Sequence, residues 1–448
     1  MYFFNANKYT LLEEFMNIKD LSKIVDAKVN DSKYLNRKVK NFSIDTRTMK
    51  NADIFIALKG KSDGHNYLKN IKKASGVIVS KNYYLNKIPV LKVDDTLESL
   101  KKIACHNRLN YNGKVIAITG SNGKTTTKEL LSHILSLKNK VFKTLKNYNN
   151  EIGLPLSLTK LNNKTKYAVL ELGMNHKGEI KELAHICKPD IAIITNIGTA
   201  HIGNLGSKKE IYKAKMEIVD GMQNKILFVN GYDDYLSKTK DAIKVTFNNS
   251  NFKISNISLG EKDILFDLMI DKTYKIKYSI PSKIQLTNVA IVIAVSLYLG
   301  IEPKIIVKGL NTFKTPENRY EIIKNKNNIV INDAYNSNLE SLFSGLESLN
   351  IYKIPKLCII GDILELGNKR KYIYRKIENK LKQKKYEYIF VGKNMKDIKI
   401  DNAIYLSQIE DLIDYYNLNK ESFENKVIYI KGSNGIKLID FVKIINNN

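Results

Sequence analysis

The chain has 448 residues, which is too long for one hydrophobic core and predicts about two to four domains. Its formal net charge of +28 comes mainly from lysine spread over the whole length, with no dense basic tract containing aromatic residues, which argues against a nucleic-acid-binding protein. Three cysteines, odd in number and far apart, argue against a disulfide framework and a cysteine-based zinc site, and favour a reducing compartment.

The N-terminal segment carries acidic residues where a signal peptide needs a continuous apolar core, and no apolar run approaches the roughly 18 residues of a membrane span. We therefore expect a cytoplasmic protein without a membrane partner. Helical patterns alternate with short runs rich in isoleucine and valine throughout the chain. This alternation predicts an α/β fold in which helices cover mostly parallel sheets.

The first predicted region covers residues 1–112. A helical pattern extends over 11–24, strand-like runs follow at 42–47 and 53–58, and a turn-rich segment lies at 59–65. We expect a small α/β domain here. No long low-complexity linker follows it, so the junction with the next domain should be short.

The second region, 113–313, opens with an apolar strand that runs into a glycine-rich turn. Such a turn directs backbone N–H groups at an anion, Lys124 would bind the β- and γ-phosphates, and the Thr125 hydroxyl would ligate Mg²⁺. A helix is expected to open at Thr126. Ile118 stands where a Walker A loop has its first glycine, so a plain turn between strand and helix is the alternative. The strand before the turn and the apolar helical pattern after it favour a nucleotide site.

Three further polar residues of the second region follow buried strands or begin a helix. Glu171 ends one strand, His201 follows another, and Lys215 lies in a helical segment. Taken singly, these residues would be read as a solvated loop carboxylate, a structural histidine and a surface lysine. The strand-like runs of this region are at 167–170, 191–195 and 226–229, and a helical run is at 286–299.

The third region, 314–448, alternates strands and helices. Its strand-like runs are at 329–332, 356–360, 388–391 and 427–430. Helical patterns separate these runs. The arrangement predicts a small open α/β sheet of the Rossmann type.

Four segments of the second region together resemble the Mur ligases of peptidoglycan synthesis. They are TGSNGKTTTKE at 119–129, ELGMNHKGEI at 171–180, TNIGTAHIGNLGS at 195–207 and AKMEI at 214–218. The resemblance extends over nearly the whole chain, in the family's order. It implies three domains: a UDP-MurNAc-peptide-binding domain, a central ATP-binding domain, and a C-terminal domain that closes over ATP and binds the incoming dipeptide. These domains correspond to the three regions above.

Other segments are similar to those of the family member that adds D-alanyl-D-alanine to UDP-MurNAc-tripeptide. They are found at 147–155, 333–338, 361–367 and 431–433, and the segment 43–65 is similar to the UDP-sugar-binding domain of this member and of its tripeptide-forming relative. The alternative within the family is the ligase that adds the third amino acid to UDP-MurNAc-dipeptide, but its Asp-Asn-Pro-Arg motif is missing. A different class of protein, a P-loop NTPase module that binds nucleic acid, is the other alternative.

The resemblance implies a role for each matching residue. The residues for ATP are Gly120, Asn122, Gly123, Lys124, Thr125, Thr126, Asn288, Arg319, Asp333 and Tyr335. Those for Mg²⁺ are Thr125, Glu171, His201 and Lys215, the lysine acting as a carbamate. Those for the UDP-linked substrate and the dipeptide are Ser43, Asp45, Arg47, Asp63, His65, Asn147, Asn150, Asn336, Lys431 and Ser433. Lys124, His201 and Lys215 would be catalytic.

Within that set, Asn288 would contact the adenine, Arg319 the phosphates and Asp333 the ribose. The structural alternatives are a helix-surface amide for Asn288, a surface ion pair between Arg319 and Asp333, and a core position for Tyr335. The implied reaction begins when the tripeptide carboxylate attacks the γ-phosphate of ATP. The amine of D-alanyl-D-alanine then displaces phosphate from the resulting acyl phosphate. A monomer is expected.

The chain departs from the family's usual residues at a few positions, which are Ser282, Ile284, Asn318, Leu339 and Asn434. Near the first two the family commonly has glycine and histidine, and at the other three it has glycine, proline and arginine. These departures affect the adenine pocket and the acceptor end of the site. The phosphate and metal residues are intact, so the implied class of reaction is unchanged.

Overall fold

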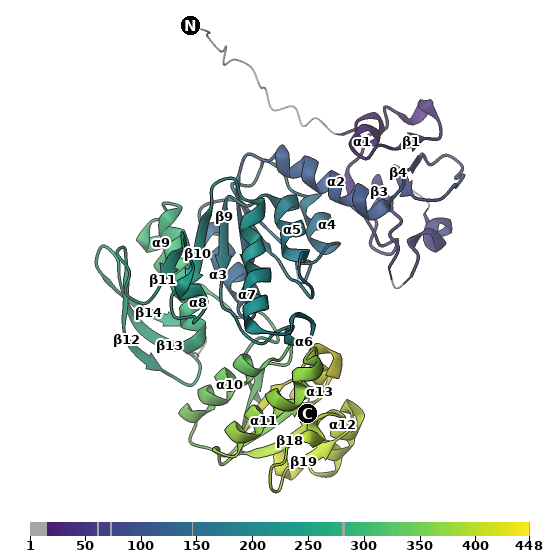
Figure 1. The fold of residues 1–448 in the computed structure, drawn as a ribbon. Coiled ribbons are helices and arrows are strands. Elements are labelled where there is room, and N and C mark those ends of the chain that lie inside the picture. The colour runs from purple at the N-terminus through teal and green to yellow at the C-terminus, as the bar shows by residue number, and fades with distance from the viewer. Residues whose placement is uncertain are drawn as a thin grey trace. The chain divides into compact units, whose positions relative to one another are not determined.

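The computed structural model describes residues 16–60, 62–71, 74–145, 147–279, 283–325 and 327–447 (Figure 1). Its contacts divide the chain into two compact units. The first contains the residues up to 111 together with 145–162, and the second contains 112–144 and 163–448. The predicted α/β class is confirmed, because most strands pair in parallel and helices connect them. The division into three domains at 112 and 313 remains a proposal.

The first unit is built on a five-stranded sheet of order β1-β5-β4-β3-β2, in which only β1 is antiparallel to its neighbour. The strands are β1 (Lys28–Val29), β2 (Asn41–Ser43), β3 (Asp53–Ile56), β4 (Gly76–Val79) and β5 (Val90–Lys92), and the helices are α1 (Ile18–Ile24), α2 (Thr96–Leu109) and α4 (Gly153–Leu158). Residues 11–15 of the predicted first helix lie outside the described residues.

Helix α4 belongs to the core of the first unit although it is distant in sequence. Leu156 of α4 packs in one hydrophobic cluster with Leu100 and Ile103 of α2. The side-chain amide of Asn107 donates hydrogen bonds to the carbonyl oxygens of Leu158 and Thr159, at 3.3 and 2.8 Å. The segment 145–162 therefore completes the first unit, although it follows β6 and β7 of the second unit in the sequence.

The second unit opens with a six-stranded, fully parallel sheet of order β11-β10-β9-β6-β8-β7. Its strands are β6 (Lys114–Thr119), β7 (Val141–Lys143), β8 (Tyr167–Glu171), β9 (Ile191–Ile194), β10 (Ile226–Asn230) and β11 (Ile243–Val245), and the helices around it are α3 (Lys124–Ser136), α5 (Glu179–Cys187), α7 (Lys208–Met216), α8 (Lys283–Tyr298) and α9 (Pro303–Thr312). Every residue of β8 and β9 is buried. Burial on both faces explains why these strands are continuous apolar runs in the sequence.

A three-stranded antiparallel sheet was not predicted from the sequence. It consists of β12 (Lys253–Leu259), β13 (Ile264–Met269) and β14 (Thr273–Tyr278). In β12, exposed and buried or half-buried residues largely alternate, so that one face is solvated. A strand of this kind has few consecutive apolar residues and gives a weak hydrophobic signal.

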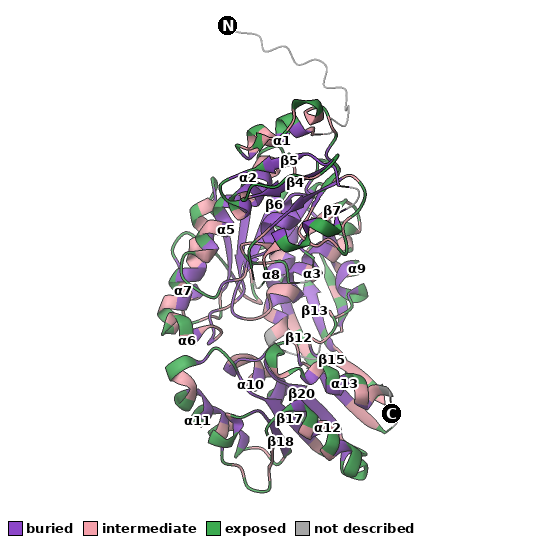
Figure 2. Ribbon diagram, turned by 90° about the vertical axis from the view of Figure 1, so that its right-hand side faces the viewer, coloured by how far each residue is buried: buried purple, intermediate pink, exposed green. Residues whose placement is uncertain are grey.

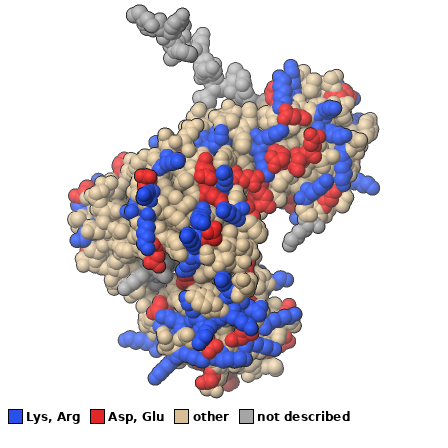
Figure 3. Space-filling view, viewed as in Figure 1, with Lys and Arg blue, Asp and Glu red and all other residues tan. Residues whose placement is uncertain are grey.

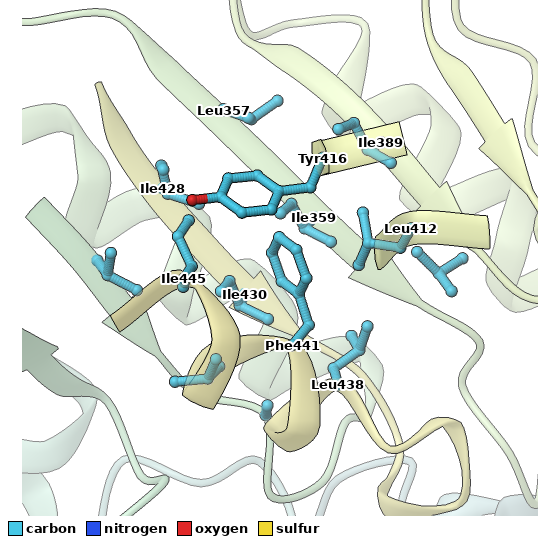
Figure 4. Packing of buried hydrophobic residues seen from close by; sticks show 14 of the residues in the cluster. Leu357, Ile359, Ile389, Leu412, Tyr416, Ile428, Ile430, Leu438, Phe441 and Ile445 are labelled. Atoms are coloured by element: carbon cyan, nitrogen blue, oxygen red, sulfur yellow. The ribbon is translucent and has the colours of Figure 1, made fainter. Parts of the chain in front are cut away.

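The C-terminal sheet has the order β15-β16-β20-β17-β18-β19, and only β15 is antiparallel. Its strands are β15 (Glu321–Asn325), β16 (Asn328–Asn332), β17 (Lys356–Gly361), β18 (Glu387–Val391), β19 (Ile404–Leu406) and β20 (Val427–Lys431), and its helices are α10 (Leu339–Ser348), α11 (Arg370–Leu381), α12 (Ile409–Leu418) and α13 (Leu438–Asn447). Figure 2 shows the buried strands between helices whose outer faces are exposed. In the core of this sheet, the rings of Tyr416 and Phe441 meet edge to face at 5.5 Å (Figure 4).

Two features of the whole chain bear on function. In the part that the structure describes, no helix has the length and hydrophobicity needed to cross a bilayer. Lysine and arginine side chains are distributed over both units, with acidic side chains among them (Figure 3). On the face shown, the basic side chains thus lie on both units rather than on one of them.

Candidate nucleotide and metal site

The phosphate loop lies at the carboxyl edge of the central sheet. Strand β6 lies between β9 and β8. The chain passes from β6 to β7 on the β8 side of the sheet and from β9 to β10 on the other side, so the two connections run in opposite directions. Ligands of open parallel sheets bind at such a switch point. Gly120, Glu171 and Thr195 follow or end these three neighbouring strands, so they lie together at one edge of the sheet.

Two glycines of the loop have no space for a side chain. A Cβ on Gly120, where φ is +150°, would lie 1.8 Å from the Thr195 hydroxyl oxygen. A Cβ on Gly123, where φ is +79°, would lie 2.4 Å from the side-chain nitrogen of Asn288. The left-handed conformation of Gly123 also caps α3, which begins at Lys124 rather than at Thr126 as predicted. The loop thus requires glycine for both conformation and close approach.

Residues after β9 fix the middle of the loop. The side-chain oxygen of Asn196 accepts a hydrogen bond from the backbone N–H of Asn122 at 2.9 Å, and its amide nitrogen donates to the Asn122 carbonyl at 3.1 Å. The Thr195 hydroxyl donates to the same carbonyl at 2.6 Å. These bonds hold the loop rigidly, which is needed for a preorganised anion site.

Lys124 and Thr125 are placed for nucleotide chemistry. The Lys124 ammonium donates a hydrogen bond to the Gly120 carbonyl at 2.7 Å, and burial lowers its pKa while the Glu171 carboxylate opposes that shift. The Thr125 hydroxyl donates to Glu171 at 2.9 Å and accepts from the Arg319 guanidinium at 3.1 Å. A buried carboxylate and a hydroxyl at this distance are hard oxygen donors of the kind that Mg²⁺ prefers.

His201 lies in the loop after β9, and Lys215 lies on helix α7. His201 has a left-handed backbone, with φ of +61°, and comes just before the short helix α6 (Ile202–Leu205). Its Nδ1 lies 2.6 Å from a carboxylate oxygen of Glu365, whose φ is also positive. Such conformations are strained for residues other than glycine and are often found at functional sites.

Lys215 on α7 is 2% exposed. It is therefore not a surface lysine, which the lysine-rich composition of the chain would suggest. Among the described residues, no hydrogen bond or ion pair of its ammonium group is found. Burial, and to a lesser degree the charge of Lys124, lowers its pKa well below the usual lysine value. The side chain is therefore biased toward the neutral amine.

The chain between the central and C-terminal sheets brings Arg319 to the phosphate loop. Its neighbours Asn318 and Tyr320 have φ values of +59° and +54°, and the guanidinium stacks over the Tyr335 ring, 3.8 Å from the ring centroid. Asparagine is among the few residues besides glycine that adopt this conformation readily. The departure from glycine at 318 therefore preserves the local backbone.

Asp333 is held by a buried ion pair. The Lys431 ammonium lies 2.6 Å from one oxygen of Asp333 and donates a second hydrogen bond, at 3.0 Å, to the Asn336 carbonyl. Lys431 is 1% exposed, so its charge lies beneath the loop that carries Asp333, Tyr335 and Asn336. The Arg319–Asp333 surface pair considered as an alternative is not found, because Asp333 pairs with Lys431.

A cavity of about 130 Å³ is lined by four loop segments, at 199–201, 336–338, 363–366 and 433–435. Its lining contains three predicted residues, His201, Asn336 and Ser433, together with Glu365 and Asn434. The departure at Asn434 therefore changes the wall of this cavity. Leu339 is the first residue of α10, a position that also suits the family's proline. Ser282 and the side chain of Ile284 lie outside the described residues.

Two protein-family models match the central and C-terminal parts of the chain. A model described as the Mur ligase middle domain matches residues 118–296, and one described as the Mur ligase, glutamate ligase domain matches residues 318–434. The UDP-N-acetylmuramoyl-tripeptide–D-alanyl-D-alanine ligase of Bacillus subtilis is 31% identical over 95% of this chain and 97% of its own length. The ligase of the same name from Rickettsia prowazekii is 33% identical over 94% and 98%.

The chain belongs to the Mur ligase family. Solved structures agree. MurF from Acinetobacter baumannii superposes with a TM-score of 0.88 at 27% identity, over 97% of this chain and 99% of that one. MurF ligase from Thermotoga maritima, solved in complex with ADP, has a TM-score of 0.82 at 25% identity, over 91% and 97%. The predicted family and fold are confirmed.

In the first unit of this Mur ligase, the predicted substrate residues form two separate polar groups. In one, the Arg47 guanidinium donates two hydrogen bonds to Asp45, at 2.9 and 2.8 Å, and the Ser43 hydroxyl accepts from the Asp45 backbone N–H. In the other, Asp63 lies 2.5 Å from Nδ1 of the buried His65 and 2.6 Å from the Lys81 ammonium. Lys81, foremost, and His65 lower the pKa of the Asp63 carboxyl.

The remaining predicted substrate residues of this Mur ligase have local structural contacts. The Asn150 side chain accepts a hydrogen bond from the Gly153 N–H at the start of α4, at 2.9 Å. The Asn147 carbonyl accepts one from the Asn149 N–H at 2.8 Å. The Ser433 hydroxyl accepts from the Leu364 N–H at 2.9 Å. These contacts order the segments that carry the three residues.

Sequence reasoning missed two charged residues of these sites, Glu365 and Lys81. Glu365 lies in the segment 361–367 that was matched to the family, and a carboxylate in a matched motif was an available signal. Lys81 is 18 residues from its partner Asp63, in a chain in which lysine is common. No local pattern distinguishes it from other lysines.

Proposed function

We propose that this Mur ligase uses ATP to join D-alanyl-D-alanine to UDP-N-acetylmuramoyl-tripeptide, giving UDP-MurNAc-pentapeptide for peptidoglycan synthesis. The observation that carries the proposal is the convergence of Lys124, Thr125 and Arg319 at the phosphate loop. Activation of a carboxylate by ATP needs this concentration of positive charge and hydrogen-bond donors. The choice of substrates within the family rests on the names of the near-full-length relatives.

In the proposed reaction, the tripeptide carboxylate attacks the γ-phosphate of ATP to form an acyl phosphate and ADP. Lys124 and Arg319 neutralise the charge that develops on the transferring group, and the backbone N–H groups of the loop orient the phosphates. The amine of D-alanyl-D-alanine then attacks the acyl carbon and expels phosphate. Water must be excluded, because the acyl phosphate would otherwise hydrolyse.

Four residues are proposed to hold Mg²⁺. Thr125 and Glu171 offer two hard oxygen atoms beside the phosphates, and His201 and Lys215 follow on the adjacent elements. Bound Mg²⁺ would neutralise phosphate charge and orient the oxygens. Magnesium is bound mainly by oxygen ligands, and an ammonium group would repel it.

Lys215 can serve such a site only after a change in its chemistry. A neutral lysine amine reacts with CO₂ to form an anionic carbamate, which supplies oxygen ligands. The buried position of Lys215 and its lowered pKa favour the neutral amine. We therefore propose that Lys215 is carbamylated in the active enzyme.

The function is tested by phosphate release from ATP with matched substrates. Turnover is expected only when D-alanyl-D-alanine is present with a UDP-MurNAc-tripeptide, and tripeptides ending in lysine and in diaminopimelate would reveal the preferred third residue. UDP-MurNAc-dipeptide with a single amino acid tests the other ligase of the family, and RNA or DNA tests an NTPase module. Turnover that depends on either of these instead would contradict the proposal.

Arg47→Ala is expected to raise the KM for the UDP-linked substrate and to leave the KM for ATP unchanged, because Arg47 is proposed to bind the UDP part. The side chain is 86% exposed, so the folded protein should be about as stable as the wild type. Arg37→Ala is a matched control, since Arg37 lies in the same unit and its guanidinium donates a hydrogen bond to the Lys87 carbonyl and stacks on the Tyr34 ring, away from Asp45. Initial rates at varied substrate concentration decide, and an effect confined to ATP would contradict the assignment.

A further inference from the structure

The first turn of α10 contacts the loop that binds phosphate and the segments that carry His201 and Lys215. Asn338, which caps α10, exchanges two side-chain hydrogen bonds with Asn122 of the phosphate loop, at 3.2 and 2.7 Å. Two residues further on, Glu340 contacts the other two segments. Asn338 accepts from the Ser341 N–H and completes a capping box, so this turn is well fixed.

Glu340 uses both of its carboxylate oxygens. One oxygen accepts hydrogen bonds from the backbone N–H and the hydroxyl of Thr199, at 2.8 and 2.7 Å. The other lies 2.8 Å from the Lys208 ammonium. Thr199 is two residues before His201, and Lys208 begins the helix that carries Lys215. A single carboxylate therefore links the segments that hold two proposed metal ligands.

The surroundings of Glu340 are shaped around its carboxylate. A Cβ on Gly198 would lie 2.8 Å from the oxygen that binds Thr199, so the loop passes as close as a glycine permits. Burial opposes ionisation of Glu340, yet hydrogen bonds from Lys208 and Thr199 lower its pKa. Charge-assisted hydrogen bonds of this kind are about twice as strong as neutral ones.

We propose that Glu340 is a positioning residue for ligation, which holds the His201 loop and helix α7 in the arrangement that the metal site requires. The inference rests on the proposed function. Glu340 acts through Thr199 and Lys208, and no contact with substrate or metal is assigned to it. Losing its charge should lower the fraction of enzyme that is competent for chemistry and leave the binding of the UDP-linked substrate unchanged.

The test compares E340Q with E347Q. Glu347 lies on the same helix and pairs with Lys380 and Lys384, both in the C-terminal part of the chain. We expect E340Q to lower kcat by about 10- to 100-fold, the range for losing hydrogen bonds to a charged group, with the KM for the UDP-linked substrate within about twofold of wild type. E347Q should retain the wild-type kcat, and the two variants should have similar Tm values.

K208M examines the other half of the contact. It is expected to lower kcat less than E340Q, because the carboxylate and its charge-assisted Thr199 hydrogen bonds remain, and the double variant E340Q/K208M should be no slower than E340Q. If E340Q does not fold, K208M and T199V decide instead, since each removes one donor and keeps the carboxylate. Retention of wild-type kcat by the folded variants, or an equal loss in E340Q and E347Q, would overturn the proposal.

Failure of the proposed function can be told apart from failure of this inference. If the wild-type enzyme did not ligate, the proposed function would fail. Hydrogen exchange of residues 199–205 would then decide the role of Glu340. Faster exchange there in E340Q than in E347Q would support the link to the His201 loop, and equal exchange would refute it.

Discussion

Replacing Lys124 by alanine should lower kcat for ligation by at least about 100-fold, the usual loss when a preorganised charge partner of a transition state is removed. The substitution deletes the ammonium that lies 2.7 Å from the Gly120 carbonyl and leaves both loop glycines in place. Because burial lowers the pKa of Lys124, the folded protein disfavours this charge, and the variant should be no less stable than the wild type. Phosphate release and thermal unfolding measure the two effects.

The matched control is Lys138→Ala. Lys138 lies just beyond the C-terminal end of the same helix and pairs with Glu302 at the surface, at 2.5 Å. This variant should ligate at close to the wild-type rate. Near-normal turnover by the Lys124 variant would contradict the nucleotide site, whereas equal losses in both variants would point to damage to α3.

Lys215→Ala is expected to be almost inactive, because the carbamate oxygens proposed to bind Mg²⁺ would be missing. Short-chain carboxylic acids should partly restore activity, since they can place an anionic oxygen in the vacated space. Lys213→Ala is the control on the same helix, because Lys213 is exposed and pairs with Glu210 at the surface. A fully active Lys215 variant would falsify the carbamate proposal.

The pH dependence of the wild-type enzyme provides a second test of Lys215. Its folded-state pKa is lowered, so the neutral amine that reacts with CO₂ persists to lower pH than in an ordinary lysine. As pH falls through that lowered pKa, the amine is protonated and the carbamate is lost. Removing bicarbonate and CO₂ at low pH should therefore reduce activity, and added bicarbonate should restore it. Activity that is indifferent to CO₂ would contradict this assignment.

The parts of the fold that the sequence predicted are those with strong local signals. The strands β6, β8 and β9 are buried on both faces and read as continuous apolar runs, and the phosphate loop depends on a short segment. The antiparallel strands β12 and β14 were missed because their exposed faces interrupt the apolar pattern, whereas β13 is largely buried and apolar and its strand signal was overlooked. Propensity and periodicity report burial more reliably than they report a half-solvated strand.

Residues of the site that depend on long-range pairing could not be predicted in the same way. Glu340 lies 141 residues from Thr199, and Glu365 pairs with His201 across a similar interval. A glutamate in the first turn of an amphipathic helix gives no sign of such a partner. The resemblance to a family supplied roles for residues in matched motifs, but not the contacts that hold those motifs together.

The insertion of residues 145–162 into the first unit has a consequence for the order of synthesis. The core that Leu156 completes against α2 stays open on the ribosome until the phosphate loop, α3 and β7 have been made. A gene fragment that stops at residue 111 would encode α2 without the helix that covers it, leaving Leu100 and Ile103 less protected. In evolution, too, the first unit could not be exchanged by a single cut and splice, because its sequence is interrupted by part of the unit that follows.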